Sequence, residues 1–198
     1  MSDDLIQKLE NTVRTVPNFP IEGVLFRDIT PVLGEPGLLS SITDRFSEDL
    51  ERLGWAPDVI VGPEARGFIF GPLLAERIGC AFVPVRKPGK LPHVTLSQEY
   101  SLEYGSNTLE IHEDAIRPGQ QAIIIDDLLA TGGTISACTR LCQACGASVI
   151  GAMTGFLMAP DDPQAVIDKM AEPEVRIVSL TITEGGYNFD ASSGEFIT

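Results

Sequence analysis

Residues 123–134, IIIDDLLATGGT, decide the fold of this chain. The stretch begins in a β-rich apolar strand, predicted over residues 121–125, and opens into a helix predicted over residues 133–145. Its glycines have no Cβ, so backbone N–H groups can close around an anion, and the N-terminus of the helix adds partial positive charge. The pattern predicts a phosphate site in which Thr131 and Thr134 donate hydroxyl groups, and Thr134 is also a candidate helix N-cap.

Two adjacent aspartates, Asp126 and Asp127, separate the strand from this loop. Carboxylates would repel a phosphate that they faced, but they accept hydrogen bonds from sugar hydroxyls. The pattern therefore indicates a ligand with a phosphate at one end and a ribose behind it. The alternative is an acidic turn that merely starts a helix. Neither GxxxxGK[ST] nor GxGxxG is present, which disfavours a Walker loop and a dinucleotide fold.

Strands alternate with helices along most of the chain, which predicts a mostly parallel five-stranded sheet flanked by helices. Such sheets bind ligands beyond the carboxyl ends of their strands. The other strands are predicted over residues 57–62, 81–85, 147–153 and 175–182, and the other helices over residues 67–79, where Gly79 is the expected C-cap, and 161–170.

Three segments fall outside this alternation within what we expect to be a single domain over residues 1–198. Residues 1–35 begin with a helix predicted from Asp4 to Val16 and continue into a Pro- and Gly-rich stretch. Residues 86–118 contain a predicted hairpin with a turn at Gly105-Ser106, and so long an insertion is typical of a lid or binding loop. Residues 184–198 are a polar tail or an extra edge strand.

The formal net charge of −14 argues against nonspecific binding of nucleic acid. A phosphorylated ligand is still compatible, because Arg86, Lys87 and Lys90 gather cations within five residues. The acidity itself fits either solubility or a saline habitat. No apolar run is long enough to span a membrane and no secretion signal is apparent, so we expect a cytoplasmic protein with reduced thiols.

Three of the four cysteines, Cys138, Cys142 and Cys145, are spaced to share one face of the helix predicted over residues 133–145. A metal site would need a fourth suitable ligand, but the two histidines, His93 and His112, belong to another segment. We therefore expect these thiols to pack in the core.

Five ordered motifs resemble the type I phosphoribosyltransferases, and the spelling DDLLATGGT resembles their adenine-specific branch. Together they cover about residues 17–157. The resemblance implies the type I phosphoribosyltransferase fold, with residues 1–35 as a small base-binding hood and residues 86–118 as a flexible hairpin flap. Besides the acidic pair and its loop, the motifs are NFPIEGVLFRDITPVL (18–33), ARGFIFGPLLA (65–75), RKPGKLP (86–92) and YSLEYG (100–105).

In the resembled family the loop that here reads GPEARG, residues 62–67, binds the diphosphate of the donor, so Arg66 would grip the leaving group. The same resemblance predicts a cis peptide bond between Glu64 and Ala65. Pro63 departs from the family pattern and removes one N–H from the loop. The alternative for Arg66 is an ordinary surface arginine ahead of a helix.

The resemblance also assigns the basic residues of the insertion. Arg86, Lys87 and Lys90 would neutralise the diphosphate, and Lys87 would reach the site of a second subunit in a homodimer. The alternative is a basic, solvated loop. Glu103, beside Tyr104 in the flap, would exchange a proton with N7 of a purine. By composition alone Glu103 is equally an exposed hairpin glutamate.

Base and sugar contacts complete the implied site. Leu25, Phe26 and Arg27 would hold the base, with backbone groups of Leu25 and Arg27 reading its edge and Phe26 stacking on its face; Phe26 is alternatively a core aromatic. Asp126 and Asp127 would contact the ribose. The 5-phosphate would lie against Ala130, Thr131, Gly132, Gly133 and Thr134.

The implied reaction is purine salvage, in which adenine and 5-phosphoribosyl 1-diphosphate give AMP and diphosphate. Mg²⁺ would be held by the substrate and by water, with no direct protein ligand. Two alternatives remain open: the same chemistry on another purine such as hypoxanthine or xanthine, or a regulator that senses ligands with this fold and performs no catalysis.

Overall fold

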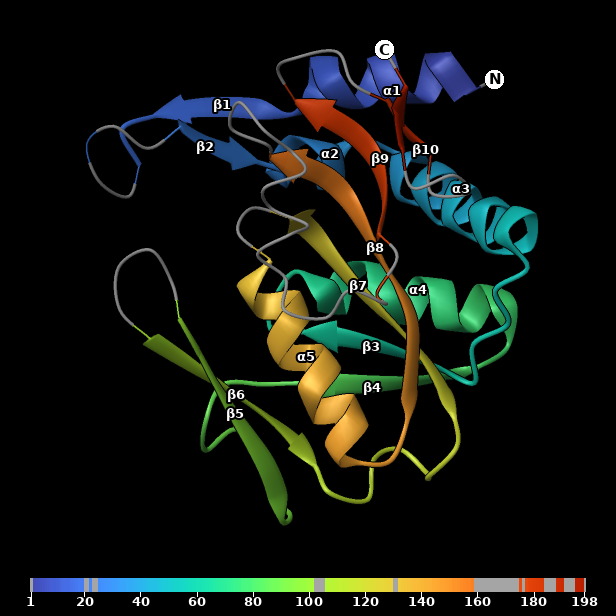
Figure 1. Ribbon diagram of the computed structural model, residues 1–198. Coiled ribbons are helices and arrows are strands. Elements are labelled where there is room, and N and C mark those ends of the chain that lie inside the picture. The colour runs from blue at the N-terminus through green and yellow to red at the C-terminus, as the bar shows by residue number, and fades with distance from the viewer. Residues whose placement is uncertain are drawn as a thin grey trace.

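The computed structural model in Figure 1 describes residues 2–19, 22, 25–101, 106–129, 132–158, 175, 177–183, 188–190 and 195–197. Its helices are α1 (Ser2–Thr12), α2 (Thr30–Gly34), α3 (Leu38–Leu53), α4 (Gly67–Ile78) and α5 (Gly133–Ala144). Its strands are β1 (Arg14–Pro17), β2 (Leu25–Asp28), β3 (Val59–Pro63), β4 (Ala81–Val85), β5 (Thr95–Ser101), β6 (Ser106–His112), β7 (Gln121–Leu129), β8 (Ser148–Met158), β9 (Ile177–Thr183), β10 (Asn188–Asp190) and β11 (Glu195–Ile197).

Five strands form the central sheet in the order β4-β3-β7-β8-β9, and every neighbouring pair is parallel. This confirms the predicted fold. The strands are near-continuous apolar runs because helices cover both faces of a parallel sheet; all five residues of β3, for example, are buried.

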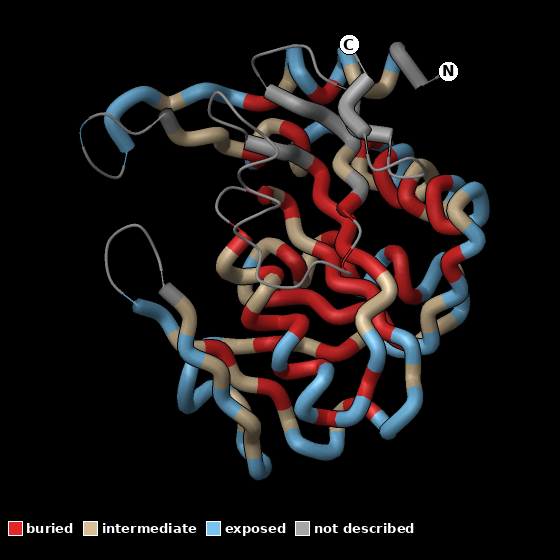
Figure 2. The backbone as a smooth tube through the Cα atoms, viewed as in Figure 1, coloured by how far each residue is buried: buried red, intermediate tan, exposed pale blue. Residues whose placement is uncertain are grey.

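Two apolar clusters form the core, one on each face of the sheet. Side chains of α5 pack on one face, against residues such as Ile124 and Ala152. Side chains of α1, α3 and α4 pack on the other face, against Ile123, Ile125 and Met153. Figure 2 shows this buried core running along the sheet beneath the exposed helix surfaces. Successive residues of a strand therefore serve opposite helix layers.

The N-terminal segment differs from its predicted form. α1 ends at Thr12, and the residues from Arg14 to Pro17 pair with β2 as an antiparallel ribbon, although the helix was predicted to continue to Val16. An ion pair between Arg14 and Asp28 at 2.8 Å supports this pairing. The helix prediction failed because tertiary pairing outweighs local propensity over four residues.

Residues 36–56, for which the sequence motifs gave no element, contain α3. Leu38, Ile42, Phe46 and Leu50 recur at helical spacing and are all buried. They line the face that packs on α4 and the sheet.

The predicted hairpin is confirmed as β5 and β6, paired antiparallel from Thr95↔His112 to Ser101↔Ser106. The hairpin and the β1–β2 ribbon extend from the same side of the body, and the carboxyl ends of β3 and β7 point to that side (Figure 1). Leu96 and Tyr100 pack against the α5 side of the core. The predicted turn at residue 105 lies outside the described residues.

The later elements follow the expected order with shifted ends. α4 ends at Ile78, and Gly79 is its C-cap as predicted, whereas β7 and β8 run further than predicted. β10 and β11 form a small antiparallel sheet of their own. Neither is therefore the extra edge strand of the central sheet that was one of the two expectations for residues 184–198. The helix predicted over residues 161–170 lies outside the described part. Among the described helices, none has the length and apolar content to cross a bilayer.

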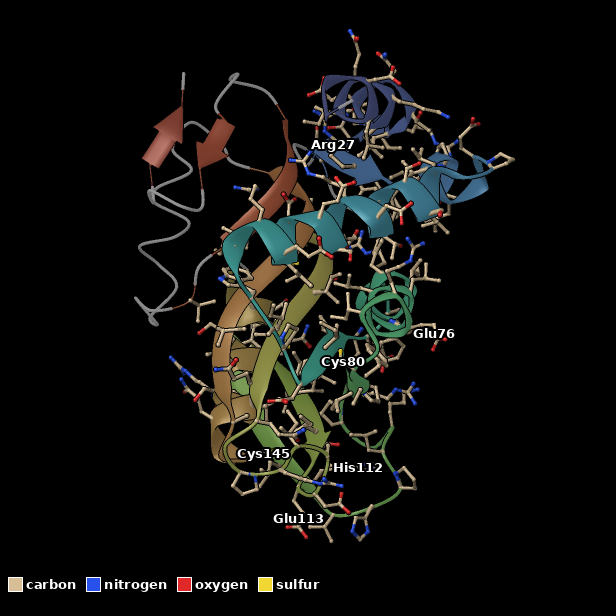
Figure 3. All side chains as sticks on the ribbon, turned by 90° about the vertical axis from the view of Figure 1, so that its right-hand side faces the viewer. Arg27, Glu76, Cys80, His112, Glu113 and Cys145 are labelled. Carbon is tan, nitrogen blue, oxygen red and sulfur yellow. The ribbon has the colours of Figure 1, made fainter. Side chains whose placement is uncertain are left out.

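The α5 cysteines pack in the core as predicted. Cys138 and Cys142 are fully buried, and burial raises the pKa of the Cys142 thiol to about 12. Cys145 lies close to His112 at the far end of α5, where its Sγ is 3.9 Å from the His112 carbonyl oxygen (Figure 3). All four cysteines are free thiols.

Gly151 provides a test of the packing between β8 and Trp55. A Cβ on Gly151 would lie 2.2 Å from the Trp55 ring. Gly151→Ala should therefore lower the free energy of unfolding by about 1–3 kcal/mol. Urea unfolding followed by circular dichroism measures this without relying on the neighbouring indole. Gly34→Ala is the control, since its Cβ would meet no atom within 4 Å; equal stability of the two variants would contradict the packing.

Candidate active site

Asp126 and Asp127 lie within β7, and not in the turn after it as predicted. β3 pairs with β7 only as far as Ile124, whereas β8 stays paired with β7 to Leu129. The longer ladder keeps the acidic pair extended, so the two carboxylates project to opposite faces of the sheet. The unpaired edge of β7 beyond Ile124 is next to the loop that follows β3.

Asp127 is the most deeply buried charged side chain of the site, at 1% exposure. Its Oδ2 lies 3.1 Å from Nη1 of Arg66, which is the residue just before α4. Within the described residues, neither oxygen of Asp127 accepts a hydrogen bond. Removing one partner of a buried ion pair is costly, so this contact ties the start of α4 to the end of β7.

Burial shapes the ionisation of both aspartates. Desolvation, reinforced by the neighbouring charge of Asp127, raises the pKa of Asp126 well above its usual value. Desolvation also raises the pKa of Asp127, although the Arg66 guanidinium opposes that rise. The backbone N–H of Asp127 donates to Oδ1 of Asp126 at 2.9 Å. A ligand that brings hydroxyl donors or positive charge here would favour the ionised pair.

The predicted phosphate loop ends in Gly132, the N-cap of α5, whose φ of 77° favours glycine. Gly133 is the first helical residue and Thr134 follows it. Thr134 is therefore not the N-cap, and no side chain caps this helix. The first N–H groups of α5 and the helix dipole together suit an anion.

The loop between β3 and α4 takes the form that the resemblance predicted, with a cis peptide bond between Glu64 and Ala65. Glycines keep it tight against the sheet. A Cβ on Gly62 would lie 2.8 Å from the Gly67 oxygen, and one on Gly67 would lie 2.8 Å from the Ile125 oxygen. The loop therefore lies directly against β7 just before the acidic pair.

Phe26 lines a pocket of about 490 Å³ between the β1–β2 ribbon and Arg66. Phe19 meets the Phe26 ring edge-on with centroids 5.0 Å apart, and the Arg66 guanidinium lies 6.0 Å from the Phe26 centroid. The lining is largely apolar and includes Val16, Ile29 and Leu33. A flat aromatic ligand fits such a site.

Arg66 thus joins three regions that the sequence analysis assigned to different parts of one ligand. It belongs to the loop predicted for diphosphate, forms an ion pair with an aspartate predicted for ribose, and lies by the aromatic ring predicted for the base. Its side chain is 41% exposed, so it remains accessible to a ligand.

The basic residues of the insertion differ in their contacts, because Arg86 is bonded within the protein whereas the two lysines are exposed. Arg86 Nε lies 3.0 Å from Oε2 of Glu64, and its Nη1 donates to the Lys90 oxygen at 3.1 Å. Desolvation acts to raise the pKa of Glu64, but hydrogen bonds from the Lys87 N–H and from Arg86 outweigh it and lower that pKa. Lys87 and Lys90 are exposed.

Arg27, on β2, contacts the hydroxyl of Thr15 across the ribbon, and Figure 3 shows it at the end of the molecule remote from His112. Leu25 pairs with Pro17 in the same ribbon. Several predicted site residues lie outside the described residues, or have side chains that do: the Leu25 side chain, Glu103, Tyr104, Ala130 and Thr131.

Some residues of the site were not singled out by sequence reasoning. Glu64 and Glu110 both accept hydrogen bonds from the loop around Lys87. Phe19 lines the pocket beside Phe26. Glu64 and Phe19 lie inside the quoted motifs, but Glu110 has no local sequence signal, because its role depends on the hairpin register.

Comparison with known proteins identifies the family. The model of the phosphoribosyl transferase domain matches residues 33–178. The adenine phosphoribosyltransferase of Lachnoclostridium phytofermentans is 52% identical over 145 residues, which cover 73% of this chain and 82% of that protein. This chain belongs to the adenine phosphoribosyltransferase family.

Solved structures agree. The adenine phosphoribosyltransferase of Thermoanaerobacter pseudethanolicus superposes with a TM-score of 0.82 at 43% identity, covering 89% of this chain and 99% of that one. The Saccharomyces cerevisiae enzyme, solved with adenine and an imino-altritol bisphosphate, gives a TM-score of 0.82 at 37% identity, covering 90% and 99%.

The raised pKa of Asp126 predicts how stability changes with pH. Because the folded chain holds the Asp126 proton more tightly than an unfolded one (pKa about 3.9), the contribution of Asp126 to stability falls as pH rises from about 4 through its folded pKa. Asp126→Asn removes this loss, so its advantage in free energy of unfolding should grow to about 1 kcal/mol or more at pH 7. Urea titrations from pH 4 to 7.5 measure the difference.

The control for that experiment is Glu76→Gln, because the Glu76 side chain is exposed on α4. It should leave the pH profile of stability almost unchanged. A stability difference for Asp126→Asn that stays constant across the pH range would mean that burial does not perturb this carboxyl group.

Proposed function

We propose that the chain transfers the 5-phosphoribosyl group from 5-phosphoribosyl 1-diphosphate to N9 of adenine, giving AMP and diphosphate. The position of Arg66 carries the proposal. One guanidinium lies 3.1 Å from a buried aspartate and 6.0 Å from an aromatic ring, at the carboxyl edge of a parallel sheet. That arrangement supports neighbouring sites for a sugar, a leaving group and a base at this edge of the sheet.

The base would enter the pocket beside Phe26, whose ring offers a stacking face. Backbone groups of Leu25 and Arg27 would supply the acceptor and donor that distinguish adenine from hypoxanthine, which presents the opposite pattern. The yeast relative was solved with adenine bound, which supports adenine as the base here.

Catalysis would rest on positioning and charge. The N–H groups at Gly132 and Gly133, with Ala130, Thr131 and Thr134, would hold the 5-phosphate, and Asp126 and Asp127 would accept hydrogen bonds from the ribose hydroxyls. Arg66 would shift its charge from Asp127 toward the diphosphate as the bond to the sugar carbon breaks. Glu103, next to Tyr104 in the flap, would take up the proton exchanged at N7.

Mg²⁺ suits this site as a partner of the substrate. Among the described residues, no group of three or more His, Cys, Asp or Glu side chains could hold a metal ion. We expect the ion to be held by diphosphate and ribose oxygens, with the protein contacting its waters. When bound it supplies charge neutralisation on the diphosphate.

We further propose a cytoplasmic homodimer in which Lys87 extends toward the neighbouring subunit's diphosphate. The exposure of Lys87 supports this contact, and the free thiols agree with a reducing compartment. The chain would be one catalytic domain with residues 1–35 as hood, 86–118 as flap and 184–198 as tail.

A diphosphate-release assay with a panel of bases tests the function. Purified protein with Mg²⁺ and 5-phosphoribosyl 1-diphosphate should release diphosphate with adenine, and far less with hypoxanthine or xanthine. Arg66→Met is the control for a contaminating enzyme, because it removes the guanidinium and should abolish most of the release. Binding of AMP without release from any base would support the ligand-sensing regulator and overturn the transferase.

Glu103→Gln tests the proton role separately. The amide keeps the size of the side chain but cannot take up a proton, so kcat should fall by about a hundredfold or more while the KM for 5-phosphoribosyl 1-diphosphate changes little. Steady-state kinetics measure both constants. Unchanged kcat would remove Glu103 from the mechanism and leave the transferase assignment intact.

A further inference from the structure

The segment from Arg86 to Lys90, here called the basic loop, is folded around two carboxylates from other elements. Glu64, in the loop after β3, accepts from Arg86 Nε and from the Lys87 N–H at 3.0 and 3.3 Å. Glu110, on β6, accepts from the Gly89 N–H at 3.1 Å. The backbone of the basic loop is therefore held from both sides by carboxylates that belong to other elements.

Glu110 also fixes the basic loop to the hairpin through its backbone. Its N–H donates to the Arg86 oxygen at 2.7 Å, and its own oxygen accepts from the Arg86 N–H at 2.9 Å. Its second carboxylate oxygen, Oε1, lies 3.3 Å from the Ser97 hydroxyl on β5. One residue thus contacts both strands of the hairpin and both ends of the turn that presents Lys87.

Gly89 makes this turn depend on the Glu110 carboxylate. Its φ of 74° reverses the chain between Lys87 and Lys90 and points its N–H at Oε2 of Glu110. If that acceptor is lost, the turn keeps its Arg86 bonds and the bond from the Lys87 N–H to Glu64, but Gly89 is no longer held, and the two ammonium groups can spread over more positions. An anion that needs both lysines would then bind more weakly, because ordering them costs side-chain and backbone entropy.

We propose that Glu110 is a positioning residue for the diphosphate group, acting through the Gly89 N–H to hold Lys87 and Lys90 in place. The inference rests on the proposed function, since it takes the basic loop as a diphosphate site. It further implies that the hairpin and the basic loop form one structural unit, because Glu110 on β6 bonds to both Arg86 and Gly89. The foot of this hairpin, at His112 and Glu113, lies far from Arg27 in the hood (Figure 3).

Side-chain length and charge make opposite predictions at Glu110. If the length of the side chain matters, which we call its reach, Glu110→Gln keeps an oxygen for the Gly89 N–H and an amide for Ser97, and this variant should bind diphosphate like the wild type. Glu110→Asp keeps the charge but is one methylene too short. It should therefore lose the bond and resemble Glu110→Ala.

The experiment is calorimetric titration of the full chain with inorganic diphosphate and Mg²⁺, and separately with AMP. Glu110→Ala and Glu110→Asp should weaken diphosphate binding about tenfold, the size expected for one hydrogen bond to a charged group. AMP affinity should change less than about twofold, because AMP does not need the basic loop. Glu99→Ala is the matched control, since Glu99 is an exposed glutamate of equal charge on the same hairpin.

Diphosphate affinity of Glu110→Ala equal to that of Glu99→Ala would overturn the inference. So would a Glu110→Gln variant as weak as Glu110→Ala, because charge and not reach would then matter. If Glu110→Ala does not fold, the comparison of Glu110→Asp with Glu110→Gln still decides. A wild type that binds diphosphate yet makes no AMP from adenine would defeat the proposed function, and the role of Glu110 would still be read from the affinities.

Discussion

The ion pair between Arg66 and Asp127 is the contact on which the arrangement of the site depends. Asp127 is almost wholly buried near the end of β7, and Arg66 is the only cation found within salt-bridge distance of it among the described residues. An unpaired carboxylate there would be costly, so the loop between β3 and α4 must approach β7 closely. The crowding around Gly62 and Gly67 shows how little space that approach leaves.

A ligand would alter the ion pair between Arg66 and Asp127 without breaking it. Arg66 is partly exposed and can contact a diphosphate while remaining near Asp127, because a guanidinium carries five N–H donors. The raised pKa values of the aspartates mean that burial opposes two negative charges at these positions. Sugar hydroxyls and a nearby cation would favour the ionised pair, so binding of the ribose and ionisation of the carboxyl groups support one another.

Apolar runs between turn residues were enough to predict β4 to the residue and the ends of β3 to within two residues, because a buried parallel strand has a simple signal. The ends of β7 and β8 could not be predicted, because Asp126 stays in the strand only through its pairing with Thr154 on β8. α3 carries a helical signal in Leu38, Ile42, Phe46 and Leu50, but this segment lies outside the motifs from which the elements were predicted. The site motifs led to Arg66 and Phe26, but the contact between them depends on the packing of the hood and was visible only in the structure.

In this strongly acidic chain, carboxylates contact Arg66 and the basic loop that we propose as the anion site. Asp127 holds Arg66, Glu64 holds Arg86, and Glu110 holds the backbone between Lys87 and Lys90. Paired cations attract a free anion less strongly at long range, yet they are already ordered when it arrives, so less entropy is lost on binding. Because Glu64 and Glu110 lie on different elements, the basic loop can take its place only when the loop after β3 and the hairpin are both in position. The acidic residues of this site therefore determine where its positive charge acts.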